Sequence, residues 1–365
     1  MNLAMRMVTT LVRGATYPGA VPEPTPYDAP PYDVLPAPVW REREAAHAAR
    51  VDAATAGHRE RRRDGRRHPV EDFLFTYYPH SPAKLRRWHP GPGVLLAGAA
   101  GDERPTWRFH RVVGDGVVLD VDSFLAARQG TVRFVRELVT RTLVRPATLG
   151  CFGLHEWAMA YRLTPEQQRH ADWPLRLGAD GTDAVVEAHQ ISCSHFDAYR
   201  FFTPQALSRN AIRPTRERQV ELEQPGCLHA GMDLYKWAFK LSPAVPSDLV
   251  ADCFDLAREI RELDMRAAPY DLIELGYEPV RIETREGKAA YVAAQRGFAV
   301  RGNALRRRLV DVLDDLLAQG DAARGDVELE QRQDAAGDSG AGHLADAPRT
   351  EPQVERLGVR VGVQP

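Results

Sequence analysis

The sequence contains few cysteines and no long apolar run. No window approaches the roughly 18 apolar residues of a membrane-spanning helix, so no membrane partner is expected. Residues 1–14 are interrupted by Arg6 and Arg13, which argues against a secretory signal peptide. The cysteines form no Cys-x-x-Cys pair, so we expect neither a zinc ribbon nor a disulfide framework, but buried free thiols in a reducing cytoplasm. They are Cys151, Cys193, Cys227 and Cys253.

Net charge is also nearly absent. The chain has 48 Lys+Arg against 50 Asp+Glu, a total that gives no reason to expect a nucleic-acid partner. The distribution is uneven, because residues 41–145 carry 20 basic against 13 acidic side chains and residues 321–355 carry 3 against 9. This asymmetry fits either a polyanion-binding face with an acidic tail or simply two solvated segments.

Changes in composition divide the chain into four segments. Residues 1–39 are rich in proline and should be extended or disordered, whereas residues 40–65 predict an exposed basic helix of Arg, Glu and Ala. Residues 66–318 hold nearly all of the apolar periodicity. Residues 319–365 are acidic, poor in aromatics and expected to be disordered. The fold class predicted is therefore mainly α, a single helical globular domain between a disordered arm and a disordered tail.

Within that domain some segments are predicted more clearly than others. The Gly-Asp-Gly turn at 114–116, between two short β-favouring runs, indicates a small β element near 94–121. Residues 178–183 are expected to form a turn, and a helix should begin at 164–167. The strongest helical periodicity lies in residues 124–143, 228–241, 247–266 and 287–317.

Three apolar segments repeat one chemical theme: a histidine, an acidic residue, and a tyrosine beside a base. Imidazole, carboxylate and phenol groups bind metals and move protons. Polar groups in apolar segments need partners when they are buried, so we expect the three segments to converge on one polar site. The segments contain His155, Glu156, Tyr161 and Arg162; His195, Asp197, Tyr199 and Arg200; and His229, Asp233, Tyr235 and Lys236.

Spacing restricts which of these groups share a face. His229 and Asp233 are four residues apart on a predicted helix, so they point to one side as two ligands or as an oriented acid–base pair. Tyr235 and Lys236 are expected to point away from that side. Farther along the chain, Asp264 is expected to form an ion pair at a helix end.

Two interpretations of the chemistry stay open. In the first, His155, His195, His229 and Asp233 hold a divalent iron, zinc or manganese ion, although the sequence has no His-Glu-x-x-His pair. That interpretation predicts a metal-dependent hydrolase or oxygenase acting on a small molecule. In the second, Asp233 or Asp197 is a general base with a histidine or tyrosine partner and an arginine that holds an anion. A non-catalytic binding module is a third class.

Longer motifs at residues 69–78, 85–91, 195–202, 225–237 and 262–266 are similar to those of a known family. The chain resembles a bacterial family, common in actinobacteria, described as 3-methyladenine DNA glycosylase. The resemblance covers roughly residues 66–305. It implies an enzyme of the hydrolase class, a DNA base-excision N-glycosylase that removes alkylated bases, with DNA as its partner.

The resemblance also implies roles for individual residues. A damaged base would be flipped into an aromatic-lined pocket, where an aspartate activates water and stabilises the developing sugar cation. Asp233 is the first candidate for this aspartate and Asp197 the second, and the remaining catalytic candidates are His155, Glu156, His195 and His229. The basic segment 41–145 would hold the DNA backbone. Substrate contacts are expected from Tyr199, Arg200, Tyr235, Lys236 and Trp237, and from a basic-aromatic patch of Arg86, Arg87 and Trp88.

Overall fold

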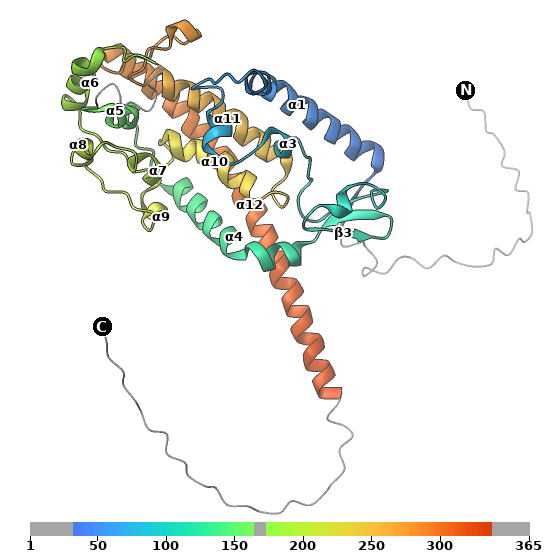
Figure 1. The fold of residues 1–365 in the computed structure, drawn as a ribbon. Coiled ribbons are helices and arrows are strands. Elements are labelled where there is room, and N and C mark those ends of the chain that lie inside the picture. Colours follow the sequence, from blue (N-terminus) through green and yellow to red (C-terminus); the bar gives the residue numbers. More distant parts are fainter. Residues whose placement is uncertain (1–31, 164–172, 338–365) are drawn as a thin grey trace, which may run out of the picture.

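The computed structural model describes residues 32–163 and 173–337. These residues form a mainly helical body with a small four-stranded sheet at one end, which confirms the predicted fold class (Figure 1). Residues 1–31 of the proline-rich arm, the helix start predicted at 164–167 and the acidic tail beyond residue 337 lie outside the described residues. No described helix is both long and apolar enough to cross a bilayer.

The first strand comes before α1, the other three strands lie between α3 and α4, and the rest of the chain is helical. The strands are β1 (Asp33–Leu35), β2 (Val94–Leu96), β3 (His110–Val113) and β4 (Gly116–Leu119). The helices are α1 (Ala37–Arg63), α2 (Phe73–Tyr77), α3 (Pro82–Leu85), α4 (Val121–Val144), α5 (Leu154–Ala160), α6 (Gly178–Glu187), α7 (Phe196–Tyr199), α8 (Pro204–Leu207), α9 (Gln219–Leu222), α10 (Leu228–Lys240), α11 (Ser247–Arg266) and α12 (Arg285–Gly337), with 3-10 turns at Arg104–Thr106 and Ile273–Leu275.

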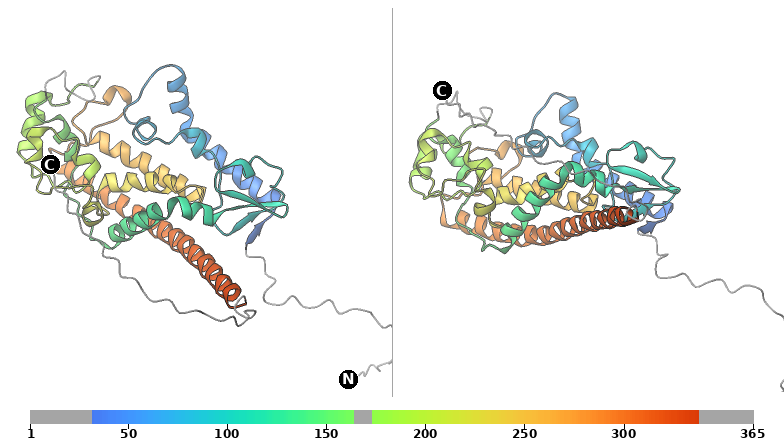
Figure 2. Two further views of the ribbon diagram at one scale, coloured as in Figure 1. Left: turned by 60° about the horizontal axis from the view of Figure 1, so that its bottom comes forward. Right: turned by 90° about the horizontal axis from the view of Figure 1, so that it is seen from below.

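The core of the body lies between α4, α10, α11 and α12, which pack against one another (Figures 1 and 2). Helix α11 buries the stripe that its periodicity predicted, and each fully buried Leu or Ile contributes about 1.5–3 kcal/mol relative to exposure. Helix α10 approaches α11 closely at Gly231, where a Cβ would stand 2.7 Å from Cδ1 of Ile260. A glycine at this position therefore sets the distance between the two helices that carry most of the site.

The sheet has the strand order β1-β2-β4-β3 and packs against the start of α1. Strand β1 runs parallel to β2, whereas the β2–β4 and β3–β4 pairs are antiparallel. The predicted turn, with Gly114 at φ +58°, joins β3 to β4 rather than β2 to β4. Strand β3 was not predicted because its first two residues, His110 and Arg111, are both polar and mask the alternation that marks a half-buried strand.

Two helices also differ from the sequence prediction. Residues 178–187 form α6 instead of a turn at 178–183, because Val185 and Val186 are buried and packing overrides the local turn preference. Helix α12 continues to Gly337, past the end predicted near residue 317, because residues 318–337 are rich in the helix formers Ala, Glu, Gln and Arg. The predicted disordered tail is therefore helical over residues 319–337.

Candidate functional site

The three histidines of the repeated theme lie side by side. His155 is on α5, His195 immediately precedes α7, and His229 is in the first turn of α10. The ring centroid of His229 is 4.3 Å from that of His155 and 5.3 Å from that of His195. The expected convergence of the three segments is thus confirmed, with all three imidazoles buried.

Local structure orients two of these groups. His195 caps α7, its Nδ1 accepting a hydrogen bond from the backbone N–H of Ala198 at 3.3 Å, which leaves Nε2 free to reach α10. On α10, the four-residue spacing brings both His229 and Asp233 into the site. Lys236 does not point away, as predicted, but turns back one helical turn to reach Asp233.

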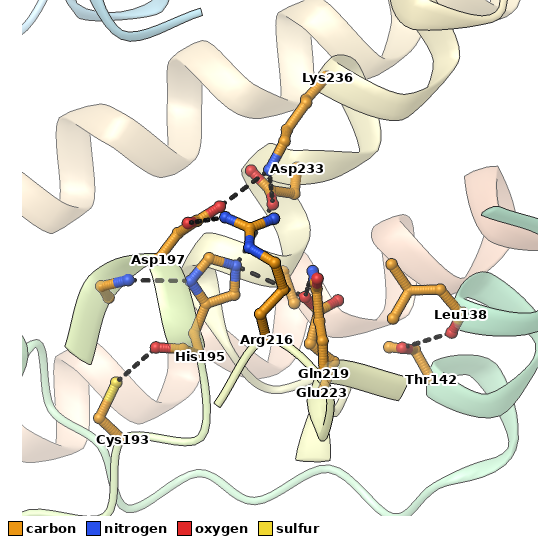
Figure 3. Close-up of polar contacts among 12 residues, drawn as sticks. Leu138, Thr142, Cys193, His195, Asp197, Arg216, Gln219, Glu223, Asp233 and Lys236 are labelled. Carbon is orange, nitrogen blue, oxygen red and sulfur yellow. Dashed lines mark hydrogen bonds and ion pairs between the residues drawn. The ribbon is translucent and has the colours of Figure 1, made fainter. Parts of the chain in front are cut away.

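The first cluster surrounds the carboxylate of Asp233 (Figure 3). Its Oδ2 lies 2.9 Å from Nζ of Lys236 and 3.3 Å from Nε2 of His195, and its Oδ1 accepts a hydrogen bond from the Tyr78 hydroxyl at 2.7 Å. Oε1 of Glu223 is 3.6 Å from the same imidazole nitrogen. Burial opposes the ionised carboxylate, but Lys236 and His195 outweigh it and lower the pKa of Asp233. Burial likewise opposes the imidazolium, yet Asp233 raises the pKa of His195.

Lys236 links this cluster to a second carboxylate. Its Nζ is 3.0 Å from Oδ2 of Asp197, so one ammonium joins two aspartates (Figure 3). The other oxygen of Asp197 faces two arginines, Arg200 at 3.3 Å and Arg216 at 3.4 Å, whose side chains are exposed. Asp197 therefore stands between the buried network and the surface.

The second cluster surrounds the carboxylate of Asp264. Its Oδ1 lies 2.9 Å from Nε2 of His155, and its Oδ2 accepts a hydrogen bond from Nη1 of Arg261 at 3.1 Å. The same guanidinium nitrogen is 3.1 Å from Oε1 of Glu156, and Nδ1 of His155 is 3.7 Å from Sγ of Cys151. Burial disfavours the imidazolium, but the adjacent Asp264 raises the pKa of His155 well above its ordinary value.

Asp264 corrects a prediction. It does ion-pair near the end of α11, with Arg261, but the pair is completely buried and includes His155, while Arg266 bonds to Glu262 instead. The sequence did indicate that Asp264 would be buried, because it follows Ile260 by four residues and so lies on the apolar stripe of α11. Glu223 was also missed, and no local pattern marks it, since it ends a four-residue helix in an irregular stretch.

His229 lies between the two clusters and differs from both other histidines. Its Nδ1 is buried and has no hydrogen-bond partner among the described residues. Burial lowers the pKa of His229 well below its ordinary value, and the neighbouring His155 lowers it further. His229 is therefore a neutral imidazole with an unsatisfied nitrogen in the interior.

A cavity of about 210 Å³ adjoins these clusters. Most of its wall is apolar, and the polar part of the wall comes from both clusters and from His229. Asp197 lines the cavity, whereas Asp233 does not. The lining consists of Phe73, Tyr77, Met159, Ala198, Phe201 and Tyr270, with Glu156, Asp197, His229 and Arg261.

The predicted stacking residues are not part of this wall. Tyr235 is fully buried in the core against Phe254, and Trp237 packs against Phe134. Tyr199 is half-buried and contacts Phe202. The aromatic wall comes instead from Phe73 and Tyr77, in the run at 73–78 that the sequence marked only as an apolar cluster, and from Phe201 and Tyr270.

The basic-aromatic patch lies at the other end of the molecule, by the sheet (Figure 1). Trp88 is buried in the cluster between the sheet and α1, so it offers no face to a ligand. Arg86 pairs with Asp52, and the guanidinium of Arg87 lies 4.9 Å from the ring centroid of Trp107. The structure thus separates this patch from the histidine site.

Comparison with known proteins finds no match: no family model, no curated protein and no solved structure.

Proposed function

We propose that this protein is a DNA base-excision N-glycosylase that removes alkylated bases of the 3-methyladenine type. The observation that carries the proposal is the cavity of about 210 Å³, which combines aromatic walls with the carboxylate of Asp197. An enzyme acting on a flipped base needs π faces to hold it and a carboxylate near the glycosidic bond. The sequence resemblance to a family described as 3-methyladenine DNA glycosylase points the same way.

In this proposal Asp197, rather than Asp233, is the catalytic carboxylate. Asp197 reaches the cavity, and its Oδ2 lies 3.0 Å from the ammonium of Lys236. A carboxylate there orients a water molecule and stabilises positive charge as the sugar–base bond breaks. Asp233 is only 1 % exposed and acts as a positioning residue, because it holds Lys236 and His195 in place.

The DNA backbone is assigned to the stretch 199–218 rather than to the patch by the sheet. This stretch carries five arginines against one glutamate, and two of the arginines contact Asp197 at the cavity. Exposed arginines bind phosphates and release counterions from DNA. The five are Arg200, Arg209, Arg213, Arg216 and Arg218.

Base release from a methylated duplex tests the proposal. The Asp197→Asn variant should release base at least about 100-fold more slowly, since a positioned acid–base group contributes about 10²–10⁴-fold. Asp180→Asn is the matched control, because Asp180 is exposed on α6 and should leave the rate unchanged. If the wild-type chain releases no base from alkylated duplex, the proposal is wrong.

A second candidate is a metal-dependent hydrolase or oxygenase acting on a small molecule. Two buried groups of potential ligands favour it, and in each group the ligand atoms lie within 4.8 Å of one another. This candidate predicts that activity disappears when a bound ion is removed. The groups are His155, His229 and Asp264, and His195, Glu223 and Asp233.

A further inference from the structure

We propose that His155, His229 and Asp264 together bind one divalent transition-metal ion beside the aromatic cavity. The inference deepens the second candidate function and rests on it, and it does not require base release. The two imidazoles and one carboxylate come from α5, α10 and α11, so the site forms only when these three helices pack together.

The spacing of the three side chains suits a single ion. Their ligand atoms lie within 4.8 Å of one another, and Nε2 of His155 is 2.9 Å from Oδ1 of Asp264. Zinc binds nitrogen and oxygen at about 2.0–2.2 Å, which places neighbouring ligands about 3 Å apart. Small rotations of buried side chains therefore complete the set without moving a helix.

His229 supplies an independent reason for a ligand. Its side chain is more than nine-tenths buried, and Nδ1 has no hydrogen-bond partner in any described part of the chain. Buried polar atoms in native proteins nearly always have a partner. An ion bound by His229 would complete the coordination of a group that the protein alone leaves unsatisfied.

In the other group, both oxygens of Asp233 are bonded by side chains that are not candidate ligands, whereas in the Asp264 group only Oδ2 is, by Arg261. Lys236 places an ammonium 2.9 Å from Oδ2 of Asp233, where an ion would bind, and Tyr78 occupies Oδ1. None of His195, Glu223 and Asp233 lines the cavity, whereas His229 does. Of the two groups, only the one around Asp264 has an unsatisfied imidazole and access to the cavity.

Two further residues, Arg261 and Cys151, contact the proposed ligands and hold them in orientation. Arg261 holds Oδ2 of Asp264, so the ion takes the place of the proton shared between Oδ1 and His155. The second nitrogen of His155 faces Sγ of Cys151 at 3.7 Å, and such contacts fix the orientation of a ligating imidazole. Three protein ligands leave at least one position for water or substrate, as in catalytic sites.

Cobalt binding to the full chain tests the site. The wild-type protein, freed of metal by a chelator, should bind one Co²⁺ per chain with visible absorption bands, and elemental analysis of untreated protein should find one transition-metal ion. Loss of an outer-shell partner weakens binding about 10–100-fold, so His229→Gln, which removes a ligand, should exceed about 100-fold. His195→Gln is the matched control and should bind within a few-fold of wild type, because His195 is an equally buried imidazole of the other cluster.

Circular dichroism establishes that each variant is folded. If His229→Gln does not fold, Cys151→Ser decides, with an expected weakening of about 10-fold. The proposal is overturned if folded wild-type protein binds no ion, if Cys151→Ser then binds as wild type does, or if His195→Gln abolishes binding while His229→Gln retains it. Base release is measured on metal-free and loaded protein separately, so failure of the glycosylase assay leaves the metal result unaffected.

Discussion

Histidines at the two ends of the molecule differ in charge: one is neutral at pH 7, and the others are cations. By the sheet, the half-buried His89 lies against His110 and Trp107, and loss of solvent lowers its pKa to about 3, so it is neutral at pH 7. At the helical end, His155 and His195 are buried at least as deeply, yet their pKa values are raised. Burial disfavours the cation in every case, but a carboxylate in direct contact reverses the result.

The distribution of buried carboxylates explains this difference. Six are buried among the described residues, and five of them are at the histidine site. The sixth, Asp72, pairs with Arg61 and His58. Desolvating a carboxylate costs several kcal/mol, and apolar side chains would fill the same volume without that cost. The concentration of buried carboxylates therefore distinguishes the candidate functional site from the packing near the sheet.

The largest difference between the two ends is expected when one acid is removed from each, Asp264 at the histidine site and Glu44 near the sheet. Asp264→Ala leaves His155 and Arg261 buried with little compensation, so the free energy of unfolding should fall by about 3–5 kcal/mol. At the sheet end Glu44→Ala removes the acidic partner of the buried Arg104, but Glu44 is 36 % exposed, so water can replace its carboxylate and the loss should be smaller, about 1–3 kcal/mol. Urea unfolding measures both. Equal losses would break the comparison.

A smaller loss is expected where one acid has a substitute. Asp233→Asn removes the charge next to Lys236, but Asp197 still neutralises the ammonium, and Tyr78 still has an oxygen to bond. The free energy of unfolding should fall by about 1–3 kcal/mol, less than for Asp264→Ala. The same urea titrations measure this loss. A loss larger than that of Asp264→Ala would show that Asp233, and not Asp264, contributes more to the stability of the site.

Acid titration should change stability less than Asp264→Ala does, and its sign distinguishes the two ends. His89 takes up a proton near pH 6.5 when unfolded but only near pH 3 when folded, so stability falls as the pH drops below about 6.5, by about 2 kcal/mol at pH 5. His89→Gln should remove this loss. In the metal-free protein His155 has the opposite sign, since its contribution is complete below about pH 6.5 and is lost as the pH rises through its raised pKa.

His155→Gln should therefore remove the loss of stability that sets in as the pH rises above about 6.5, whereas His89→Gln should remove the loss that sets in as the pH drops below about 6.5. Urea midpoints measured between pH 5 and pH 8 test both variants against wild type. If both variants change the slope in the same direction, the two ends do not differ in the way described.

Much of the helical framework could be predicted from the spacing of apolar residues along the chain. Helices α10 and α11 were predicted nearly to their ends, because their apolar residues repeat at helical spacing. The meeting of His155, His195 and His229 also followed from sequence, because polar groups in apolar segments need partners. Strand β3 and helix α6 did not, since their local residues favour other structures and packing decides them.

The pairing within the site followed from sequence only in part. Asp264 lay on a recognisable apolar stripe, but its partner His155 is 109 residues away. Glu223 carried no local mark, and Lys236 pairs with Asp197, which lies on another element 39 residues earlier. Contacts between elements depend on how helices cross, and no spacing within one helix specifies that.

The sequence by itself determined that this chain forms a helical body and that histidines and acids are drawn into its interior. Only the tertiary structure decided which histidine is charged, which is neutral, and which acid reaches the cavity. The physical reason is that a pKa depends on the atoms within a few ångströms, and at this site those atoms belong to helices distant in the sequence.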